Sequence, residues 1–210
     1  MKLQVIVGTT RPTRAADKVL PWLTERTSKH PAFETEILDL RDWPLPFFQE
    51  HLGTIGDMND PTYSDPLVKR WNQKIKEADA YVILTAEYHH GIPAVLKNAI
   101  DTVFVSFGFR QKPVAFVAYS AGLSGGTRSV EHLNQVMIET EAIPIRLPTL
   151  IPFVENAFDA SGHPISPATD AGMTVLLDDL AWLAKALKTA RAEGQLPPAN
   201  FRLRAAVAKK

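Results

Sequence analysis

Residues 8–14 (GTTRPTR) bring hydroxyl and guanidinium side chains together in one short segment. The segment follows the apolar run 3–7 and precedes a helical pattern, so we expect it at a helix N-terminus. Free backbone N–H groups, hydroxyl groups and arginines are the donors that bind phosphate. The residues expected to contribute are Thr9, Arg11, Thr13 and Arg14. The alternative is an ordinary turn with two solvated arginines.

Two common nucleotide-binding motifs are absent from this segment. A Walker loop needs Gly-Lys-Ser or Gly-Lys-Thr after four spacer residues, and a dinucleotide loop needs G-x-G-x-x-G. Residues 8–14 match neither pattern. If the segment binds a phosphate, the predicted ligand is therefore a mononucleotide.

Residues 87–91 (EYHHG) form a second group of side chains that could do chemistry. They follow the apolar run 80–84 and precede a predicted helix. Tyr88 offers a face for stacking on a flat ring, and Gly91 allows close approach of the backbone. A tyrosine packed at the rim of a loop is the simpler alternative. The candidate ligand-facing residues are Glu87, Tyr88, His89 and Gly91.

The paired histidines also raise the question of a metal site. Adjacent residues of an extended segment point to opposite sides, so one site would rarely use both His89 and His90. No further ligands lie at a convincing spacing. A serine hydrolase would need the G-x-S-x-G frame, which the sequence around Ser124 lacks. We therefore predict neither a metal nor a catalytic side chain.

Residues 120–126 (SAGLSGG) form a third, glycine-rich segment at the end of a predicted strand. Its hydroxyl groups and backbone N–H groups could serve as donors at the same edge of a sheet. Alone it reads as an ordinary glycine-rich turn. The candidate binding residues are Ser120, Gly122 and Gly125.

Composition excludes several classes of function. The 210 residues carry 23 basic and 23 acidic side chains, so no global field attracts nucleic acid or an anionic membrane. The absence of cysteine excludes thiol catalysis, thiolate metal sites and disulfides, and it suits a reducing cytoplasm. The apolar run near the start is too short for a signal peptide, and no run reaches the roughly 20 residues that span a bilayer. We expect a cytoplasmic protein.

Strand and helix patterns alternate along the chain. Strands are predicted at 3–7, 33–40, 80–85, 113–120 and 144–151, and helices from about 15, at 66–78, 93–105, 127–140 and 171–192. Residues 41–64 look irregular, and Pro144 and Pro148 place the last strand at a sheet edge. Residues 1–193 are expected to form one domain, followed by a Pro-containing basic tail at 194–210, frayed or docked on a partner subunit.

This alternation predicts an α/β fold with a five-stranded parallel sheet covered on both faces. Two strand orders fit the count. In the order 2-1-3-4-5, the switch point lies between the first and third strands, and a ligand binds at their carboxyl ends. Residues 8–14 and 87–91 would then share one cleft.

These segments resemble the NADPH-dependent FMN reductase family, which includes azo-, quinone- and chromate-reducing members. Gly8, Thr9 and Arg11 fit its G-[ST]-x-R pattern, and residues 85–101 are similar to its T-P-E-Y-N-x-G-x-P-x-x-L-K-N-A-I-D stretch. The similarity extends over roughly residues 3 to 155. The sequence departs from the family pattern at Thr13 for Gly, Ala86 for Pro and His89 for Asn.

The resemblance implies a flavodoxin-like three-layer sandwich that binds FMN and uses NADPH or NADH. It assigns the FMN phosphate to residues 9–14, the flavin ring to residues 87–91 and the far edge of the ring to residues 120–126. Hydride would pass from NAD(P)H through FMN to a quinone, azo dye or flavin in ping-pong order. A homodimer or homotetramer is implied, with residues 43–48 and 104–109 as candidate interfaces. An FMN-binding electron-transfer module and a flavin-free interaction protein remain the alternatives.

Overall fold

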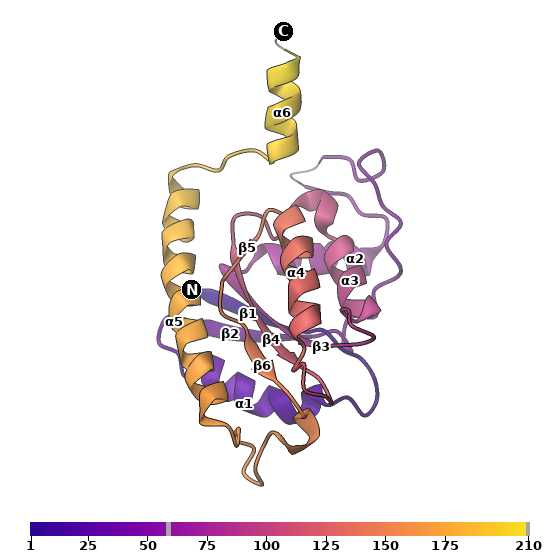
Figure 1. The fold of residues 1–210 in the computed structure, drawn as a ribbon. Helices are drawn as coiled ribbons and strands as arrows, with labels where there is room; N and C mark the ends of the chain where they lie inside the picture. Colours follow the sequence, from indigo (N-terminus) through magenta and orange to yellow (C-terminus); the bar gives the residue numbers. More distant parts are fainter. Residues whose placement is uncertain (58–59, 209–210) are drawn as a thin grey trace.

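The computed structural model, which describes residues 1–57 and 60–208, has one parallel sheet between two layers of helices (Figure 1). Its strand order is β2-β1-β3-β4-β5, with β6 also paired to β4. This confirms the predicted α/β class, the parallel sheet and the order 2-1-3-4-5. The strands are β1 (Lys2–Val7), β2 (Glu34–Asp39), β3 (Ala80–Ala86), β4 (Pro113–Tyr119), β5 (Ile143–Pro144) and β6 (Thr149–Ile151).

The predicted fifth strand at 144–151 is wrong as a single element. The structure divides it into β5 and β6, and both pair in parallel with β4. Pro148 directly precedes β6 and has no N–H group to donate to the neighbouring strand, so the hydrogen-bond ladder is interrupted there. Among the described residues the sheet therefore has six strands, and the predicted edge position of this segment is confirmed.

Helices cover both faces of the sheet (Figure 1). One face carries α1 (Ala16–Ser28) and α5 (Pro167–Glu193), whose buried residues share one core cluster. The opposite face carries α2 (Pro66–Lys76), α3 (Ala94–Asp101) and α4 (Thr127–Glu139). Asp65 caps α2 by accepting from the N–H groups of Leu67 and Val68.

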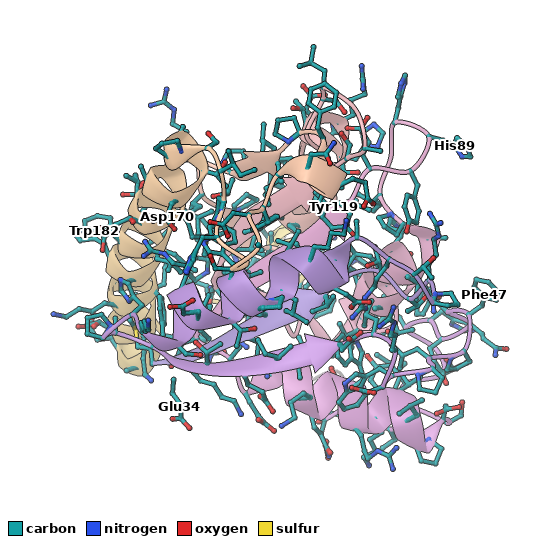
Figure 2. All side chains as sticks on the ribbon, turned by 90° about the horizontal axis from the view of Figure 1, so that it is seen from below. Glu34, Phe47, His89, Tyr119, Asp170 and Trp182 are labelled. Atoms are coloured by element: carbon teal, nitrogen blue, oxygen red, sulfur yellow. The ribbon has the colours of Figure 1, made fainter. Side chains whose placement is uncertain are left out.

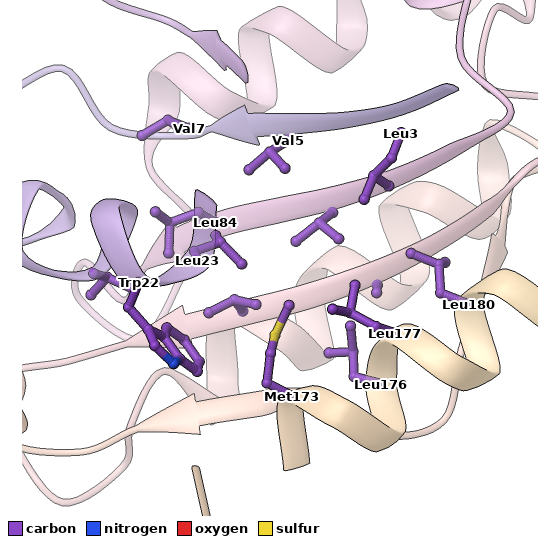
Figure 3. Packing of buried hydrophobic residues seen from close by; sticks show 14 of the residues in the cluster. Leu3, Val5, Val7, Trp22, Leu23, Leu84, Met173, Leu176, Leu177 and Leu180 are labelled. Carbon is purple, nitrogen blue, oxygen red and sulfur yellow. The ribbon is translucent and has the colours of Figure 1, made fainter. Parts of the chain in front are cut away.

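Alternate residues of each central strand enter opposite cores. Leu3, Val5 and Val7 of β1 pack against α1 and α5, as Figure 3 shows, while Ile6 belongs to the core beneath α2, α3 and α4. Because both faces are buried, the strands read as continuous apolar runs rather than as an alternating pattern. Burial on both sides fixes the strands whose carboxyl ends carry the candidate binding segments.

The helix predicted at 93–105 is shorter in the structure. It ends at Asp101 and is followed by the 3₁₀ turn η1 (Phe104–Ser106). The hydroxyl group of Thr102 donates to the Ala99 carbonyl at 3.0 Å, an alternative to continued helix bonding.

The expected irregular region 41–64 contains no helix or strand among its described residues. Asn98 of α3 ties it down by donating to the Pro46 carbonyl at 2.8 Å.

The carboxyl-terminal part is more helical than the sequence predicts. The helix α5 begins four residues before the predicted start at 171, because Pro167 suits its first turn. Residues 194–208 contain α6 (Ala199–Val207), which extends away from the sheet in Figure 1. The proposed division at residue 193 stays a prediction. Within the described part of the chain, no helix combines the length and the apolar character needed to cross a bilayer.

Candidate functional site

The first candidate segment, residues 8–14, begins where β1 meets β3 and α3. Gly8 donates its N–H to the Leu84 carbonyl at 2.8 Å. A Cβ at Gly8 would lie 2.8 Å from Leu96 Cδ2 and 3.1 Å from the Leu84 oxygen, so only glycine fits without movement. This close approach brings the segment beside the carboxyl end of β3.

Arg14 holds this segment together from inside. Its side chain is 1% exposed, and its Nη1 donates to Asp39 Oδ1 at 2.7 Å while Nη2 donates to the other carboxylate oxygen. Nε donates to Asp17 at 2.8 Å, and Nη1 also reaches the Thr9 carbonyl. Burial raises the pKa of the Asp39 carboxyl, but the bonds from Arg14 outweigh this and leave the pKa below its usual value.

The donors left for a ligand are on the outer side of the segment. The N–H groups of Thr10, Arg11 and Thr13 donate to no acceptor within the described residues, and their side chains are exposed. No side chain caps the N-terminus of α1. Free N–H groups, two hydroxyl groups, a guanidinium and an uncapped helix start fit a phosphate group. The donor set of this structure therefore fits the phosphate of FMN.

The second segment, residues 87–91, is a tight turn. Tyr88 and Gly91 exchange two backbone hydrogen bonds of 2.9 Å each. Between them, His89 and His90 are exposed and have φ angles of 49° and 65°. A turn with positive φ at both central residues favours Asn or Gly, and His accepts this region more readily than most residues do. The turn therefore presents two imidazoles at its tip.

Glu87 faces α4 rather than the open side of the turn. Its side chain is 6% exposed and pairs with Arg128, with Nη1 2.8 Å from Oε1. The backbone N–H of Arg128 also donates to this carboxylate, at 3.2 Å. Burial raises the pKa of Glu87, and the bonds from Arg128 more than offset this, so the pKa is lowered. Glu87 positions the turn.

Ser129 adds a second anchor for the same turn. Its hydroxyl group is 2.9 Å from the Ala86 carbonyl and 2.7 Å from the Gly91 carbonyl. A Cβ at Gly91 would approach His132 Nδ1 to 3.5 Å, an ordinary contact, so the fold itself does not require glycine there. Close approach of a ligand to Gly91 stays a prediction.

The first two segments meet across the carboxyl edge of the sheet. The Arg11 guanidinium carbon lies 5.9 Å from the centre of the Tyr88 ring, within the range of a cation–π contact. Tyr119, the last residue of β4, places its hydroxyl 3.3 Å from Thr9 Oγ1. Figure 2 shows His89 on an outlying loop and Tyr119 further in. We call the region between residues 8–14, 87–91 and 120–126 the cleft.

The third segment, residues 120–126, is a compact turn beside the second. Ser120 Oγ donates to the Gly122 carbonyl at 2.9 Å. Gly125 has φ of 59°, and a Cβ there would lie 3.1 Å from the Pro152 nitrogen. The requirement for glycine is stronger at Gly126, because its φ is 94° and a Cβ there would lie 2.6 Å from Ala118 Cβ. Gly122 has open space around it.

Sequence reasoning missed the residues that support the cleft from other elements. Asp39 ends β2, and Arg128 lies in the first turn of α4. Tyr119 could have been suspected, because a tyrosine at the end of a strand that precedes a glycine-rich turn faces the same edge as residues 8–14. In the described residues, no group of three or more His, Asp or Glu side chains could hold a metal ion.

Comparison with known proteins identifies the family. The family model described as NADPH-dependent FMN reductase matches residues 1–153. The chain belongs to this family. Its relatives include an NAD(P)H-dependent FMN reductase of Schizosaccharomyces pombe, 35% identical over 135 residues, which are 64% of each chain. An NAD(P)H-dependent FMN reductase of Pseudomonas aeruginosa is 33% identical over 63% of this chain and 69% of its own length.

A further relative carries a quinone in its name. An NADPH:quinone oxidoreductase of Arabidopsis thaliana is 32% identical over 66% of this chain and 68% of its own length. The fold is similar to that of a flavoenzyme NAD(P)H:acceptor oxidoreductase from Paracoccus denitrificans, with a TM-score of 0.70 and 20% identity. That alignment covers 88% of this chain and 97% of the other, and supports the flavodoxin-like fold.

Proposed function

We propose that this chain is an oxidoreductase that binds FMN in the cleft and transfers a hydride from NAD(P)H to a small acceptor. The acceptor is a quinone, an azo compound, a flavin or a similar flat oxidant. One observation carries the proposal. The uncapped N-terminus of α1, with its free N–H groups, lies beside the aromatic turn at 87–91, and Arg11 contacts Tyr88 between them. For a quinone, one hydride and one proton yield the hydroquinone and NAD(P)⁺.

The residues of the first segment divide into two roles. Arg11, Thr13 and the outer N–H groups would bind the phosphate of FMN. Thr9 and Arg14 were predicted as phosphate ligands, and their buried positions support a different role, in which they keep the segment in shape for those donors. Bound FMN would supply the hydride chemistry, both as acceptor from NAD(P)H and as donor to the second substrate.

The other two segments would orient the ring. Tyr88, His89 and Gly91 would lie along the ring, with Glu87 holding the turn against α4. Ser120, Gly122 and Gly125 would bring backbone donors to its far edge. No side chain is needed as a general acid or base, because the second substrate can take its proton from solvent.

Ping-pong kinetics follow if NAD(P)H and the acceptor use the same open face in turn. Initial rates measured over a grid of NADPH and quinone concentrations should give parallel double-reciprocal lines. Intersecting lines would mean that both substrates are bound together, and they would refute this order. The same assay over quinones, azo dyes and free flavins, with NADPH and NADH, defines the acceptor and the coenzyme preference.

The proposal includes assembly into a homodimer or homotetramer in the cytoplasm. The 43–48 segment supports this, because Phe47 is 83% exposed although it is a large apolar residue. Sedimentation equilibrium of the wild type should give a multiple of the 23.2 kDa chain mass. Phe47→Glu should lower that mass, and a wild type that sediments as a monomer would refute the proposal.

A further inference from the structure

A groove runs beside the cleft, between β6 and the start of α5. It has a volume of about 560 Å³, and its lining residues come from two stretches of the described chain, 147–157 and 165–172. The residues that line it are uncharged, and Glu155 and Asp170, which lie in the same stretches, are not among them. At its rim, Leu147, Phe153 and Ile165 are 39%, 51% and 63% exposed. This volume lies in the range of small-molecule pockets, which is roughly 300–1,000 Å³. The lining suits an uncharged apolar ligand.

The groove and the cleft share a wall. The N–H of Phe153 donates to the Gly122 carbonyl at 3.1 Å, and the N–H of Val154 donates to the Ser120 carbonyl at 3.0 Å. The N–H of Ile151 reaches the Gly125 carbonyl at 3.3 Å. Residues 151–154 therefore join the lining of the groove to the third segment of the cleft.

Phe153 marks the point of contact by its backbone. Its φ of 47° lies in the left-handed region, which bulky residues rarely adopt. The bond to Gly122 and the following 3₁₀ turn η2 (Val154–Asn156) hold it there with half of its side chain exposed. Backbone strain of this kind concentrates at ligand-binding sites.

We propose that this groove binds the uncharged alkyl or prenyl chain of an acceptor whose quinone ring lies in the cleft. The inference rests on the proposed function, and it narrows the acceptor to quinones that carry an apolar chain. The groove adjoins the third segment of the cleft and its lining is uncharged, and both features favour an apolar chain attached to the ring over a second copy of the protein.

A homologous series of alkyl-1,4-benzoquinones tests the proposal in the FMN-loaded protein. KM should fall about fourfold for each added methylene that enters the groove, equivalent to about 0.8 kcal/mol per CH₂. It should level off once the groove is filled. The value of kcat should stay constant, because the chain does not touch the reacting atoms. A KM that is independent of chain length would overturn the inference.

Gly172 of α5 offers a variant that closes the groove without disturbing the fold. It lines the groove, and a Cβ there would meet no atom within 4 Å. Gly172→Leu should remove the advantage of a decyl chain by at least tenfold in KM and leave unsubstituted benzoquinone unchanged. Gly172→Ala is the matched control and should keep the dependence on chain length.

Equilibrium dialysis of decyl-benzoquinone separates the inference from the proposed function. Wild type should bind the ligand, and Gly172→Leu should bind it at least tenfold more weakly, even if the protein fails to oxidise NAD(P)H. Failure of NAD(P)H oxidation alone refutes the proposed function, whereas equal binding by both proteins refutes the groove. A lower oligomer mass for Gly172→Leu in sedimentation would show that a second copy covers the groove, which also overturns the inference.

Discussion

Arg14 and Asp39 provide the sharpest test of how the first segment is built. Removing Asp39 leaves a guanidinium whose side chain is 1% exposed with only Asp17, itself 45% exposed, as a charged partner. Loss of one member of a buried pair lowers the free energy of unfolding by about 3–5 kcal/mol. Because the bond to Asp17 remains, we expect Asp39→Asn to lower it by about 3 kcal/mol. Arg14→Met should cost less, about 1–3 kcal/mol, because the freed Asp39 carboxylate is partly exposed and can be hydrated.

Urea unfolding of the FMN-free protein at neutral pH, followed by circular dichroism, measures both changes and the double variant. The free energy of unfolding of the double variant should be close to that of the less damaging single variant, because the two residues act as a pair. Arg11→Met is the matched control. It should change stability by less than about 0.5 kcal/mol, since Arg11 is exposed, but weaken FMN binding by about 10-fold or more.

Acid adds a second signature of the same pair. The pKa of Asp39 is lowered in the folded state, so its contribution to stability is present above the ordinary carboxyl pKa, near about 4, and is lost as the pH falls below it. Wild type should therefore lose more stability on acidification than Asp39→Asn does. If Arg14→Met instead leaves stability intact and mainly weakens FMN binding, Arg14 is a phosphate ligand and not the residue that holds the segment together.

Three further predictions concern single residues. His89→Asn should raise the free energy of unfolding by about 0.5–1 kcal/mol, because Asn adopts positive φ more readily. A loss of stability would contradict the turn geometry. If the variant leaves flavin affinity and redox potential unchanged, His89 has no role of its own toward the flavin. Gly126→Ala should lower stability by about 3 kcal/mol or more, since its Cβ would lie 2.6 Å from Ala118 Cβ; a melting temperature equal to that of wild type would show that the turn can move. Burial, with a smaller effect of nearby Arg191, lowers the pKa of Lys112 from 10.5 to about 7. The unfolded chain therefore binds more protons between these values, and wild-type stability should rise with pH there, by at most about 1.4 kcal/mol per unit, whereas Lys112→Met should lack this slope.

The sheet could be predicted from sequence because its signal is local. Apolar runs such as 80–85 and 113–120 are continuous because both faces of each strand are buried, and the alternation with helices then leaves few strand orders. The division into β5 and β6 was missed, although Pro148 is visible in the sequence. The effect of that proline depends on how a short edge segment pairs with β4.

Side-chain roles in the cleft were harder to predict because distant partners decide them. Arg14 has a side chain typical of a phosphate ligand, but it pairs with Asp39 inside the protein, and Asp39 is 25 residues away in the sequence. Glu87 lies in the 87–91 turn, and its carboxylate pairs with Arg128 of α4, which is 41 residues further along the chain. Residue type and spacing predicted the three segments, which the structure brings to one edge of the sheet, whereas long-range ion pairs decide which of their side chains are engaged within the protein.

Separate half-reactions without oxygen show whether bound FMN takes a hydride from NAD(P)H and passes it to an acceptor. The protein is loaded with FMN, freed of excess flavin and mixed anaerobically with one equivalent of NADPH, while the visible flavin absorbance is followed. We expect the yellow colour to bleach, and a quinone added after removal of NADP⁺ to restore it fully. A protein that binds FMN but stays yellow with both NADPH and NADH would be an electron-transfer module, and a protein that binds no FMN would contradict the account of the cleft itself.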